Sequence, residues 1–430
     1  MNYKEKLNSL IPGGAHTYSR GHDQYPCNAP EILVRGEGSY VWDTDGRKFL
    51  DYGMGLRAVG LGYAYKPVAD AAIREIWNGN NLTRASTIEL KAAETITELI
   101  DGAEMVKFAK NGSTVTTAAL KLARAYTGRK LVAVCADHPF FSYDDWFIGA
   151  TAVPRGVPEE IQSLSLKFKY NDVQSLQALF DRYPGQIAAV MLEPVTVTPP
   201  HDDFLLKVQN LCRKNGTVFI LDEMITGFRF HLKGAQHIFK LKPDLSTFGK
   251  AMANGFSVAA LVGRRDIMEL GGITKEGAER VFLVSTTHGA EMCGMGAFVK
   301  TVEIYASEPV IGHVWDYGQK LINGMNTLAK EAGVESYFKA EGYPCSPAYI
   351  TKDSSGKASL EMRTLFSQEL IKHGVLMPWI ALSYSHGEQE LEKTLDAVRK
   401  ALGIYAKAIT EGVGKYLVGP AIKPVFRKHN

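Results

Sequence analysis

The chain is short of the features that mark disulfide-bonded, metal-binding and membrane-spanning proteins. Its 430 residues include five cysteines, and no two of them form a C-x-x-C pair, which argues against a disulfide framework or a thiolate metal site and indicates a reducing compartment. The eleven histidines show no H-x-x-x-H spacing, so no metal is expected. No run approaches the about 18 apolar residues that a membrane-spanning helix needs.

The net charge and the N-terminal residues argue against further classes of protein. A net charge of +3 without a Lys/Arg-rich run argues against nucleic-acid binding. The first residues lack the apolar core of a secretory signal, so we expect a cytoplasmic protein. What remains is an ordinary globular composition, 45% apolar and 22% charged, in a chain long enough for a large α/β core and a smaller domain.

Strand and helix patterns alternate through the middle of the chain. Apolar residues at helical spacing predict helices near 90–100, 115–128 and 204–214. Short apolar runs predict strands at 105–109, 130–135, 187–192, 217–221, 245–248, 258–262 and 281–285. Strands that alternate with helices imply an α/β fold with a mostly parallel sheet flanked by helices.

The two ends of the chain have a different pattern. The first sixty residues combine glycines and aromatics with short alternating stretches that turn at Asp45-Gly46, which is typical of an extended arm with a small antiparallel element. Beyond about residue 300, helices alternate with short strands and end in a long helix from about Gly387. We therefore expect segment 1–60 to form the arm and part of a small domain, 61–300 a large domain, and 301–430 the rest of the small domain.

An acidic residue and a lysine follow two successive predicted strands. Asp222 ends the run 217–221, and Lys250 follows the run 245–248, about one strand-helix-strand unit further on. Open α/β sheets place their chemistry beyond the carboxyl ends of the strands. A buried carboxylate facing a lysine is what pyridoxal 5′-phosphate (PLP) requires, because the lysine carries the cofactor as a Schiff base and the carboxylate keeps the pyridine nitrogen protonated. Taken singly, a helix cap and a solvated lysine would explain the two residues as well.

Short sequence motifs across nearly the whole chain resemble those of class III (ω-type) aminotransferases of PLP fold type I, most closely the glutamate-1-semialdehyde aminomutase branch. The most specific motif is DEMITGFR at 222–229 with the Gly249-Lys250 pair downstream. Less specific motifs lie at 12–14, 42–46, 122–129, 193–195 and 243–250. The resemblance implies a large PLP-binding domain at 61–300 and a smaller α+β domain built from the N- and C-terminal parts.

The resemblance implies the catalytic residues and the residues at the ring. Lys250 would be the Schiff-base lysine and, once freed, a proton carrier, while Asp222 would pair with the pyridinium nitrogen. Met224 would lie against one face of the ring, and Phe140 would cover the other if a two-residue insertion is allowed, which also aligns Asp145 with a family aspartate. Without that insertion His138 would be the stacking residue.

The resemblance also implies a phosphate site. The phosphate-binding motif of the family aligns with Asn111, Gly112 and Ser113. A glycine turn at the start of a helix would offer backbone N–H groups and a hydroxyl to the phosphate. A helix cap without a ligand would use the same residues. Thr286, with Thr287 as the alternative, aligns with a threonine that reaches the phosphate from the partner subunit, so a homodimer with shared active sites is expected. Glu193 belongs to the same set of cofactor-binding residues.

Two arginines are the predicted substrate contacts. Arg20 aligns with the arginine that aminomutases use on the substrate carboxylate, and its planar fork suits that task. The tryptophan that aminomutases carry falls on Leu56 here, with Arg57 beside it, and an aminomutase glutamate falls on Pro378 or Trp379.

These departures favour one reaction over two others. We expect a PLP-dependent aminotransferase that moves an amino group from an amino acid, with glutamate as the expected donor, to a keto or aldehyde acceptor such as an oxidised sugar or a keto acid. Glutamate-1-semialdehyde 2,1-aminomutase and a PLP-dependent racemase or epimerase are the alternatives.

Overall fold

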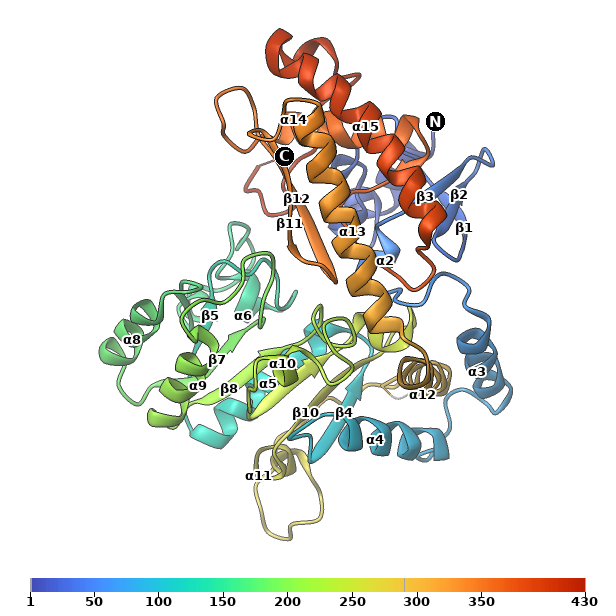
Figure 1. Ribbon diagram of the computed structural model, residues 1–430. Coiled ribbons are helices and arrows are strands. Elements are labelled where there is room, and N and C mark those ends of the chain that lie inside the picture. Colours follow the sequence, from blue (N-terminus) through green and yellow to red (C-terminus); the bar gives the residue numbers. More distant parts are fainter. Residues whose placement is uncertain (1, 290, 430) are drawn as a thin grey trace. The chain divides into compact units, whose positions relative to one another are not determined.

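The computed structural model describes residues 2–289 and 291–429 (Figure 1). The chain forms two compact units. One is made by the two ends of the chain, up to Tyr65 and from Gly312 onward, and the other is Lys66–Ile311. We call them the terminal unit and the central unit.

The central unit is built on a sheet of seven strands among the described residues. In spatial order they are β4 (Met105–Ala109), β10 (Ala259–Gly263), β9 (Leu245–Phe248), β8 (Val218–Asp222), β7 (Ile187–Leu192), β5 (Leu131–Cys135) and β6 (Ser165–Phe168). The pairs from β6 to β9 are parallel, whereas β10 runs antiparallel to both β9 and β4. The predicted mostly parallel sheet is therefore confirmed.

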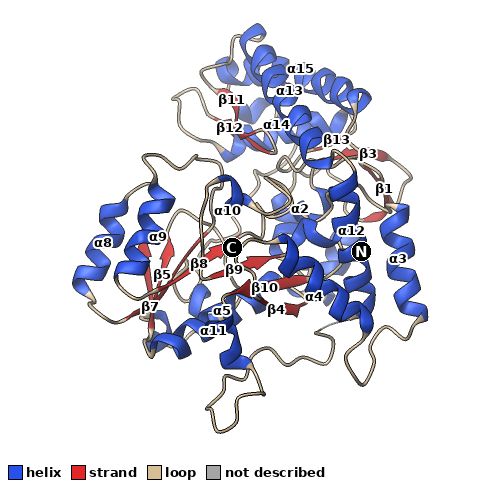
Figure 2. Cartoon of the chain, turned by 60° about the horizontal axis from the view of Figure 1, so that its bottom comes forward, coloured by secondary structure: helices blue, strands red, loops and turns tan. Residues whose placement is uncertain are grey.

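Both faces of this sheet are covered, as Figure 2 shows with helices around the strands. Every residue of β7 and β8 is buried, which is why these runs are continuously apolar instead of alternating. The helices of this unit are α3 (Lys66–Trp77), α4 (Thr87–Leu99), α5 (Gly112–Thr127), α6 (Asp145–Ile148), α7 (Glu159–Gln162), α8 (Val173–Arg182), α9 (Phe204–Lys214), α10 (Ala235–Ile238), α11 (Arg265–Met268) and α12 (Met292–Ser307). Helix α5 lies against β4, β7, β8, β9 and β10.

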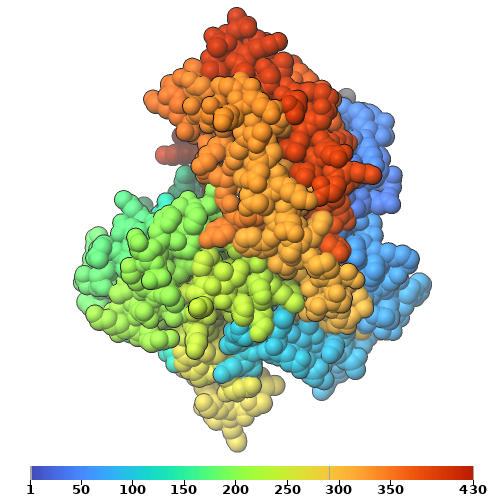
Figure 3. Space-filling model, viewed as in Figure 1, coloured from blue at the N-terminus to red at the C-terminus, as the bar shows by residue number. Residues whose placement is uncertain are grey.

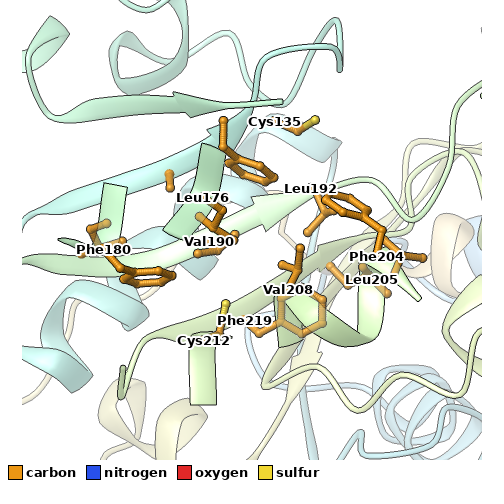
Figure 4. Packing of buried hydrophobic residues seen from close by; sticks show 14 of the residues in the cluster. Cys135, Leu176, Phe180, Val190, Leu192, Phe204, Leu205, Val208, Cys212 and Phe219 are labelled. Atoms are coloured by element: carbon orange, nitrogen blue, oxygen red, sulfur yellow. The ribbon is translucent and has the colours of Figure 1, made fainter. Parts of the chain in front are cut away.

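One hydrophobic cluster joins the sheet to α8 and α9 (Figure 4). Val190 and Leu192 of β7 and Phe219 of β8 meet Val208 and Cys212 of α9, and all of these side chains are buried. Each large apolar side chain buried in this way contributes about 1.5–3 kcal/mol relative to an exposed one. This packing holds β7 and β8 rigidly, so the residues at their carboxyl ends have fixed positions.

The strand predicted at 281–285 is wrong, and the strand β6 was not predicted. Residues 281–285 have no regular secondary structure, and Phe282 is 64% exposed. An apolar run can form a strand only where another strand offers a free edge, and a short run does not carry that information. Strand β6 was missed because its residues, SLKF, include two polar ones and give a weak strand pattern.

The terminal unit joins the two ends of the chain in one sheet. Its four strands are β1 (Leu33–Glu37), β2 (Tyr40–Asp43), β3 (Lys48–Asp51) and β13 (Val375–Leu376), in that spatial order. The predicted turn at Asp45-Gly46 is confirmed, since β2 and β3 pair as an antiparallel hairpin and Gly46 has a φ of 79°. Because β13 pairs with β3, the predicted smaller α+β domain of N- and C-terminal parts is confirmed.

The helices of this unit are α1 (Tyr3–Leu10), α2 (Met54–Arg57), α13 (Val310–Glu331), α14 (Leu360–Lys372) and α15 (Glu388–Glu411), and a hairpin of β11 (Phe338–Tyr343) and β12 (Ser346–Thr351) completes the unit. Helix α14 packs against the smaller sheet, where Ile371 contacts the cluster of Val41, Phe49 and Leu376. Figure 3 shows α13 in orange beside α15 in red, and the ion pair between Glu331 and Arg399, 2.8 Å long, joins the two helices. Helix α15 begins directly after Gly387, as predicted.

In the part of the chain that the structure describes, no helix is both long enough and apolar enough to cross a membrane. The same residues contain no group of three or more His, Cys, Asp or Glu side chains that could hold a metal ion. The five cysteines are free thiols.

Candidate active site

Asp222 is the last residue of β8 and lies beside Thr247 of β9. The two residues are paired in the parallel ladder, and the Thr247 hydroxyl donates to Oδ1 of Asp222 at 3.0 Å. The backbone N–H of Met224 donates to the same oxygen at 2.9 Å. Among residues 2–289 and 291–429 no hydrogen bond reaches Oδ2, so this oxygen is available to a donor such as a pyridinium N–H.

The side chain of Asp222 is 2% exposed, and its burial governs its acidity. Burial raises the pKa of Asp222 above its usual range, while the hydrogen bond from Met224, the positive charge of Lys250 and the hydrogen bond from Thr247 oppose this shift. A cation bound at Oδ2 would favour the ionised carboxylate in the same way as Lys250 does.

Lys250 lies just beyond the end of β9, in the short helical turn Lys250–Ala253. Its positive charge acts on Asp222, so the structure brings the two predicted catalytic residues to one edge of the sheet. Lys250 has a φ of 46°, a left-handed conformation that L-residues rarely adopt and that proteins tolerate mainly at functional sites.

Met224 occupies the space between two glycine turns. A Cβ atom added to Gly249 would lie 2.6 Å from the Met224 sulfur, and one added to Gly112 would lie 3.0 Å from it. The thioether therefore touches both the turn before Lys250 and the start of α5. This contact places the predicted phosphate turn, Asn111–Ser113, next to the predicted lysine and the predicted ring-packing residue.

The phosphate turn begins α5. Asn111 caps the helix by accepting the Thr114 N–H on Oδ1 at 3.0 Å. The amides of Gly112 and Ser113 precede the first intrahelical hydrogen bond and point out of the positive end of the helix, which is the usual geometry of a phosphate site. The Ser113 hydroxyl accepts the Tyr143 N–H at 3.0 Å and keeps its own proton for a ligand.

Phe140 and His138 are the two candidates for the residue that stacks on the cofactor ring. Phe140 is 46% exposed, and its ring meets the ring of Phe147 edge-on at 5.9 Å. His138 is buried, and its Nδ1 accepts the backbone N–H of Glu193 at 3.0 Å. Burial lowers the pKa of His138 to about 4, so its ring is neutral with the proton on Nε2.

Two glutamates at this edge have different positions. Glu193 directly follows Leu192, the last residue of β7, which pairs with Leu221, and Glu193 is buried. Glu223 caps the start of a helix instead: its carboxylate accepts hydrogen bonds from the N–H groups of Ala235 at 3.0 Å and Gln236 at 2.6 Å. Glu223 therefore holds the start of α10, and only its neighbour Asp222 faces the candidate site.

Thr286 belongs to the segment that precedes α12. It is exposed in the loop before α12, and its carbonyl oxygen accepts the Gly289 N–H at 3.2 Å. Across the described residues Thr286 makes no hydrogen bond to Asn111, Gly112 or Ser113. Its predicted role at the phosphate of a partner subunit stays a prediction, and Thr287 is exposed in the same loop.

In the terminal unit, Arg20, Leu56 and Trp379 line one cavity of about 670 Å³. These are three of the positions at which the sequence was compared with aminomutases. Arg57 makes other contacts: its Nη1 donates to the Ser346 hydroxyl at 3.1 Å and to the Ile380 carbonyl at 3.2 Å. These bonds fix the Arg57 guanidinium against the strand and loop of the C-terminal part.

Leu56 and Arg57 belong to a left-handed turn that the sequence analysis missed. Met54, Gly55, Leu56 and Arg57 all have φ between 40° and 67°. A left-handed conformation costs about 1–2 kcal/mol for each residue other than glycine. The turn is held by Asp51, whose carboxylate accepts the N–H groups of Gly53 at 2.7 Å and Met54 at 2.9 Å and the Tyr63 hydroxyl at 2.7 Å.

The residues of the central unit fit PLP. A buried carboxylate has one oxygen without a hydrogen bond from the described residues, a helix start offers amides and a hydroxyl, and a lysine stands next to that carboxylate. When bound, PLP supplies an electron sink for the carbon that carries the amine. Asp222 would hold the ring nitrogen, Asn111–Ser113 the phosphate and Lys250 the cofactor aldehyde.

Comparison with known proteins agrees with this fit. The family model described as aminotransferase class-III matches residues 18–377. The 3-aminobutyryl-CoA aminotransferase of Cloacimonas acidaminovorans is 32% identical over 421 residues, which cover 95% of this chain and 98% of that protein. The glutamate-1-semialdehyde 2,1-aminomutase of Francisella tularensis subsp. tularensis is 31% identical over 415 residues, which cover 91% and 95%.

A solved structure agrees as well. The FumI protein of Sphingopyxis sp. MTA144, in its PLP internal aldimine form, superposes with a TM-score of 0.87 at 25% identity, over 95% of this chain and 97% of that one. The type I fold predicted for PLP enzymes is therefore confirmed. The chain belongs to the class III aminotransferase family and is a PLP-dependent enzyme.

Proposed function

We propose that the protein is an intermolecular aminotransferase, which takes an amino group from an amino acid such as glutamate and gives it to a separate carbonyl compound. The observation that supports this most is the cavity of the terminal unit, which Leu56 and Trp379 line. Leu56 falls on the tryptophan of the aminomutase branch, and the glutamate of that branch falls on Pro378 or Trp379. An aminomutase must retain one five-carbon intermediate between the two halves of its reaction. A cavity without those contacts suits an enzyme that releases one product and then binds another substrate.

The described residues can carry out the proton transfers of this reaction. The Lys250 amine would remove the proton from the substrate carbon and deliver it to C4′ of the cofactor, and it would return the proton in the opposite half-reaction. Asp222 would keep the ring nitrogen protonated, and Thr247 and Met224 orient its carboxylate. The Met224 side chain, 8% exposed, would exclude water from one face of the ring.

The acceptor class is proposed from similarity and from the sequence. The relative from Cloacimonas acidaminovorans bears the name of an enzyme for a coenzyme A thioester, so a thioester-linked substrate is one candidate for this chain. An oxidised sugar or a keto acid is the other. Arg20, which is exposed and lines the cavity, would bind a carboxylate of donor or acceptor.

The aminomutase reaction is the second candidate. It is supported by Arg20, which aligns with the carboxylate-binding arginine of that branch, and by the relative from Francisella tularensis. A racemase or epimerase would use the same Lys250 proton transfer without releasing a keto acid.

We also propose a homodimer in which Thr286 contributes to the phosphate site of the partner subunit. The exposed apolar side chains of α3 support this, because Ile73, Ile76 and Trp77 are 49%, 50% and 85% exposed. Light scattering of the purified protein tests the dimer, and a monomer that binds the cofactor with full affinity would contradict it.

One spectroscopic experiment tests the proposed function. The PLP-loaded protein should absorb near about 420 nm, and Lys250→Ala should lose that band. Glutamate should convert the band to that of the aminated cofactor and release 2-oxoglutarate, and a carbonyl acceptor should restore it. Isomerisation of glutamate 1-semialdehyde without net consumption of a donor would instead identify an aminomutase, and a band that no amino acid changes would refute aminotransfer.

A further inference from the structure

We propose that Lys110 is a positioning residue for the cofactor phosphate, because its ion pair with Glu291 fixes the turn Asn111–Ser113 before the phosphate binds. The inference rests on the proposed function, since it assumes that this turn holds the phosphate. It is carried by the ion pair, by the hydrogen bonds that hold the Glu291 carboxylate and by the packing of α12, all within the central unit.

Lys110 directly precedes the phosphate turn, and its ammonium pairs with a carboxylate from a distant part of the chain. Its Nζ donates to Oε2 of Glu291, which lies 181 positions further along. The two side chains are 26% and 29% exposed, so water screens this pair less than a pair on the open surface. The hydrogen bond from Lys110 is the main cause that lowers the pKa of the Glu291 carboxyl, which therefore stays ionised.

Glu291 is held in turn by Asn80, in the loop between α3 and α4. The Nδ2 of Asn80 donates to Oε1 of Glu291 at 3.0 Å. The Oδ1 of Asn80 accepts the Cys293 N–H at 3.0 Å, and its carbonyl oxygen accepts the Met292 N–H at 2.8 Å. One asparagine thus binds both the carboxylate and the first two amides of α12, so the carboxylate has a fixed place relative to the helix.

Helix α12 gives these contacts a rigid support. It packs against α3 and α4, and most of its residues are buried. A Cβ atom added to Gly294 would lie 2.8 Å from a methyl carbon of Val258, so the start of the helix also touches the segment beyond Lys250. Because protein interiors are closely packed, a buried helix of this kind resists displacement. Glu291 therefore anchors the Lys110 ammonium to a part of the fold that does not move with the turn.

The main chain of Lys110 is fixed as well. The Ser257 hydroxyl donates to the Lys110 carbonyl at 2.6 Å, and Ser257 is the neighbour of Val258, which touches α12. The residue before the phosphate turn is thus held at its carbonyl and at its ammonium, from two segments that contact each other. Together with the helix cap, these contacts give the free amides of the turn a fixed direction.

Two effects of Glu291 on phosphate binding have opposite signs. As an anchor it favours binding, because a turn that is fixed in advance loses less conformational entropy when the anion arrives. As a negative charge near the site it opposes binding. Since Lys110 neutralises the carboxylate through a direct hydrogen bond, its charge acts weakly beyond the pair, and we expect the anchoring effect to be the larger.

The test measures the Kd of the full-length apoprotein for PLP and for pyridoxal, which has the same aldehyde and ring nitrogen but no phosphate. Absorbance titration follows both ligands. Lys110→Met should raise the Kd of PLP about tenfold and that of pyridoxal less than about twofold. Glu291→Gln, which keeps the size of the side chain, should raise the Kd of PLP about threefold. The double variant should bind PLP as Lys110→Met does, because the two residues act as one unit.

Two further variants are controls. Lys110→Arg keeps a cation that can reach the carboxylate and should bind PLP within about threefold of the parent. Lys107→Met removes the same charge at an exposed position of β4, three residues earlier in the chain, and should leave both Kd values unchanged. The second control separates the ion pair from a general attraction of the unit for anions.

Each contrary outcome has its own meaning. An unchanged Kd of PLP in Lys110→Met would overturn the inference, and so would an equal loss of affinity for PLP and pyridoxal, which would indicate damage to the whole unit. Tighter PLP binding by Glu291→Gln would overturn it as well, because Lys110 would then act as a free charge. These results would leave aminotransfer intact. If the parent forms no absorbance band with PLP, the proposed function itself fails.

Discussion

The hydroxyl of Thr247 donates to Oδ1 of Asp222 across 3.0 Å, from the next strand of the sheet. The two residues are 25 positions apart in the sequence, and the bond joins the end of β8 to β9, the strand that leads to Lys250. Since it opposes the upward shift that burial causes, it helps to keep the Asp222 carboxylate ionised.

Removal of this bond should weaken cofactor binding. Thr247→Val keeps the shape of the side chain but loses the donor, so the pKa of Asp222 should rise further and its pairing with a pyridinium should weaken. A hydrogen bond to a charged group contributes about 1.5–3 kcal/mol, which predicts a rise of about tenfold or more in the Kd of PLP. Absorbance titration of the apoprotein measures it. Thr247→Ser keeps the hydroxyl and should bind PLP nearly as well as the parent; equal affinities of the Val and Ser variants would contradict the role.

His386 should make the protein less stable in acid. Its ring is fully buried, and Nδ1 accepts the Ser383 N–H at 3.1 Å. Burial lowers the pKa of His386 to about 4 from 6.5, and the charge of Glu390 opposes this only in part. Because the folded-state pKa is depressed, the stabilising contribution is complete above pH 6.5 and is lost as the pH falls from 6.5 to about 4.

The size of this effect is about 3 kcal/mol at most. Urea unfolding at pH 7 and near pH 4.5 measures it, and His386→Gln should lose less stability between the two conditions than the parent. His373→Gln, at an exposed position of the same unit, is the control and should leave the pH dependence unchanged. A parallel pH dependence in His386→Gln and the parent would show that another group titrates.

Asp51 should be essential for the left-handed turn at Met54–Arg57. Asp51→Ala leaves two backbone N–H groups and the Tyr63 hydroxyl without their acceptor in a buried place, which predicts a loss of about 2–4 kcal/mol in the free energy of unfolding. Tyr63→Phe removes one of the three donors and should cost less. Limited proteolysis should cut Asp51→Ala near the turn first; a variant as stable and as resistant as the parent would refute this role.

The last residues of the chain should hold the arm that carries Arg20. The Nη2 of Arg427 donates to Oδ2 of Asp23 at 2.5 Å, and the Lys423 N–H donates to the Asp23 carbonyl at 2.9 Å. Arg427→Ala should therefore increase amide hydrogen exchange in residues 20–28 about tenfold. Lys428→Ala is the control with the same change of charge at an exposed position. Unchanged exchange in Arg427→Ala would show that other contacts fix the arm.

Much of the large sheet could be predicted from short apolar runs. The runs at 105–109, 187–192 and 245–248 have the bounds of β4, β7 and β9, and every residue of β7 and β9 is buried. The run at 281–285 has the same local character but no strand partner in the described chain. Local hydrophobicity does not distinguish the two cases, because pairing depends on which strand edge remains free.

Asp222 and Lys250 could be found from the sequence because each follows a strong strand pattern and the order of the strands brings their carboxyl ends to one edge. The contacts around them could not. Thr247 as a donor to Asp222, Met224 between Gly112 and Gly249, and Glu223 as a cap of α10 depend on which side chains face each other after folding.

The sequence by itself determined the family and the chemistry. One predicted strand is followed by Asp222 and another by Lys250, and together with the family motifs these two residues specify a PLP enzyme. Only the tertiary structure decided how the terminal residues are used. It gathered Arg20, Leu56 and Trp379, which lie up to 359 positions apart in the sequence, around one cavity, and it turned Arg57 toward Ser346 and Ile380. The physical reason is that a cavity wall is made by long-range packing, in which no segment contains the information about its neighbours.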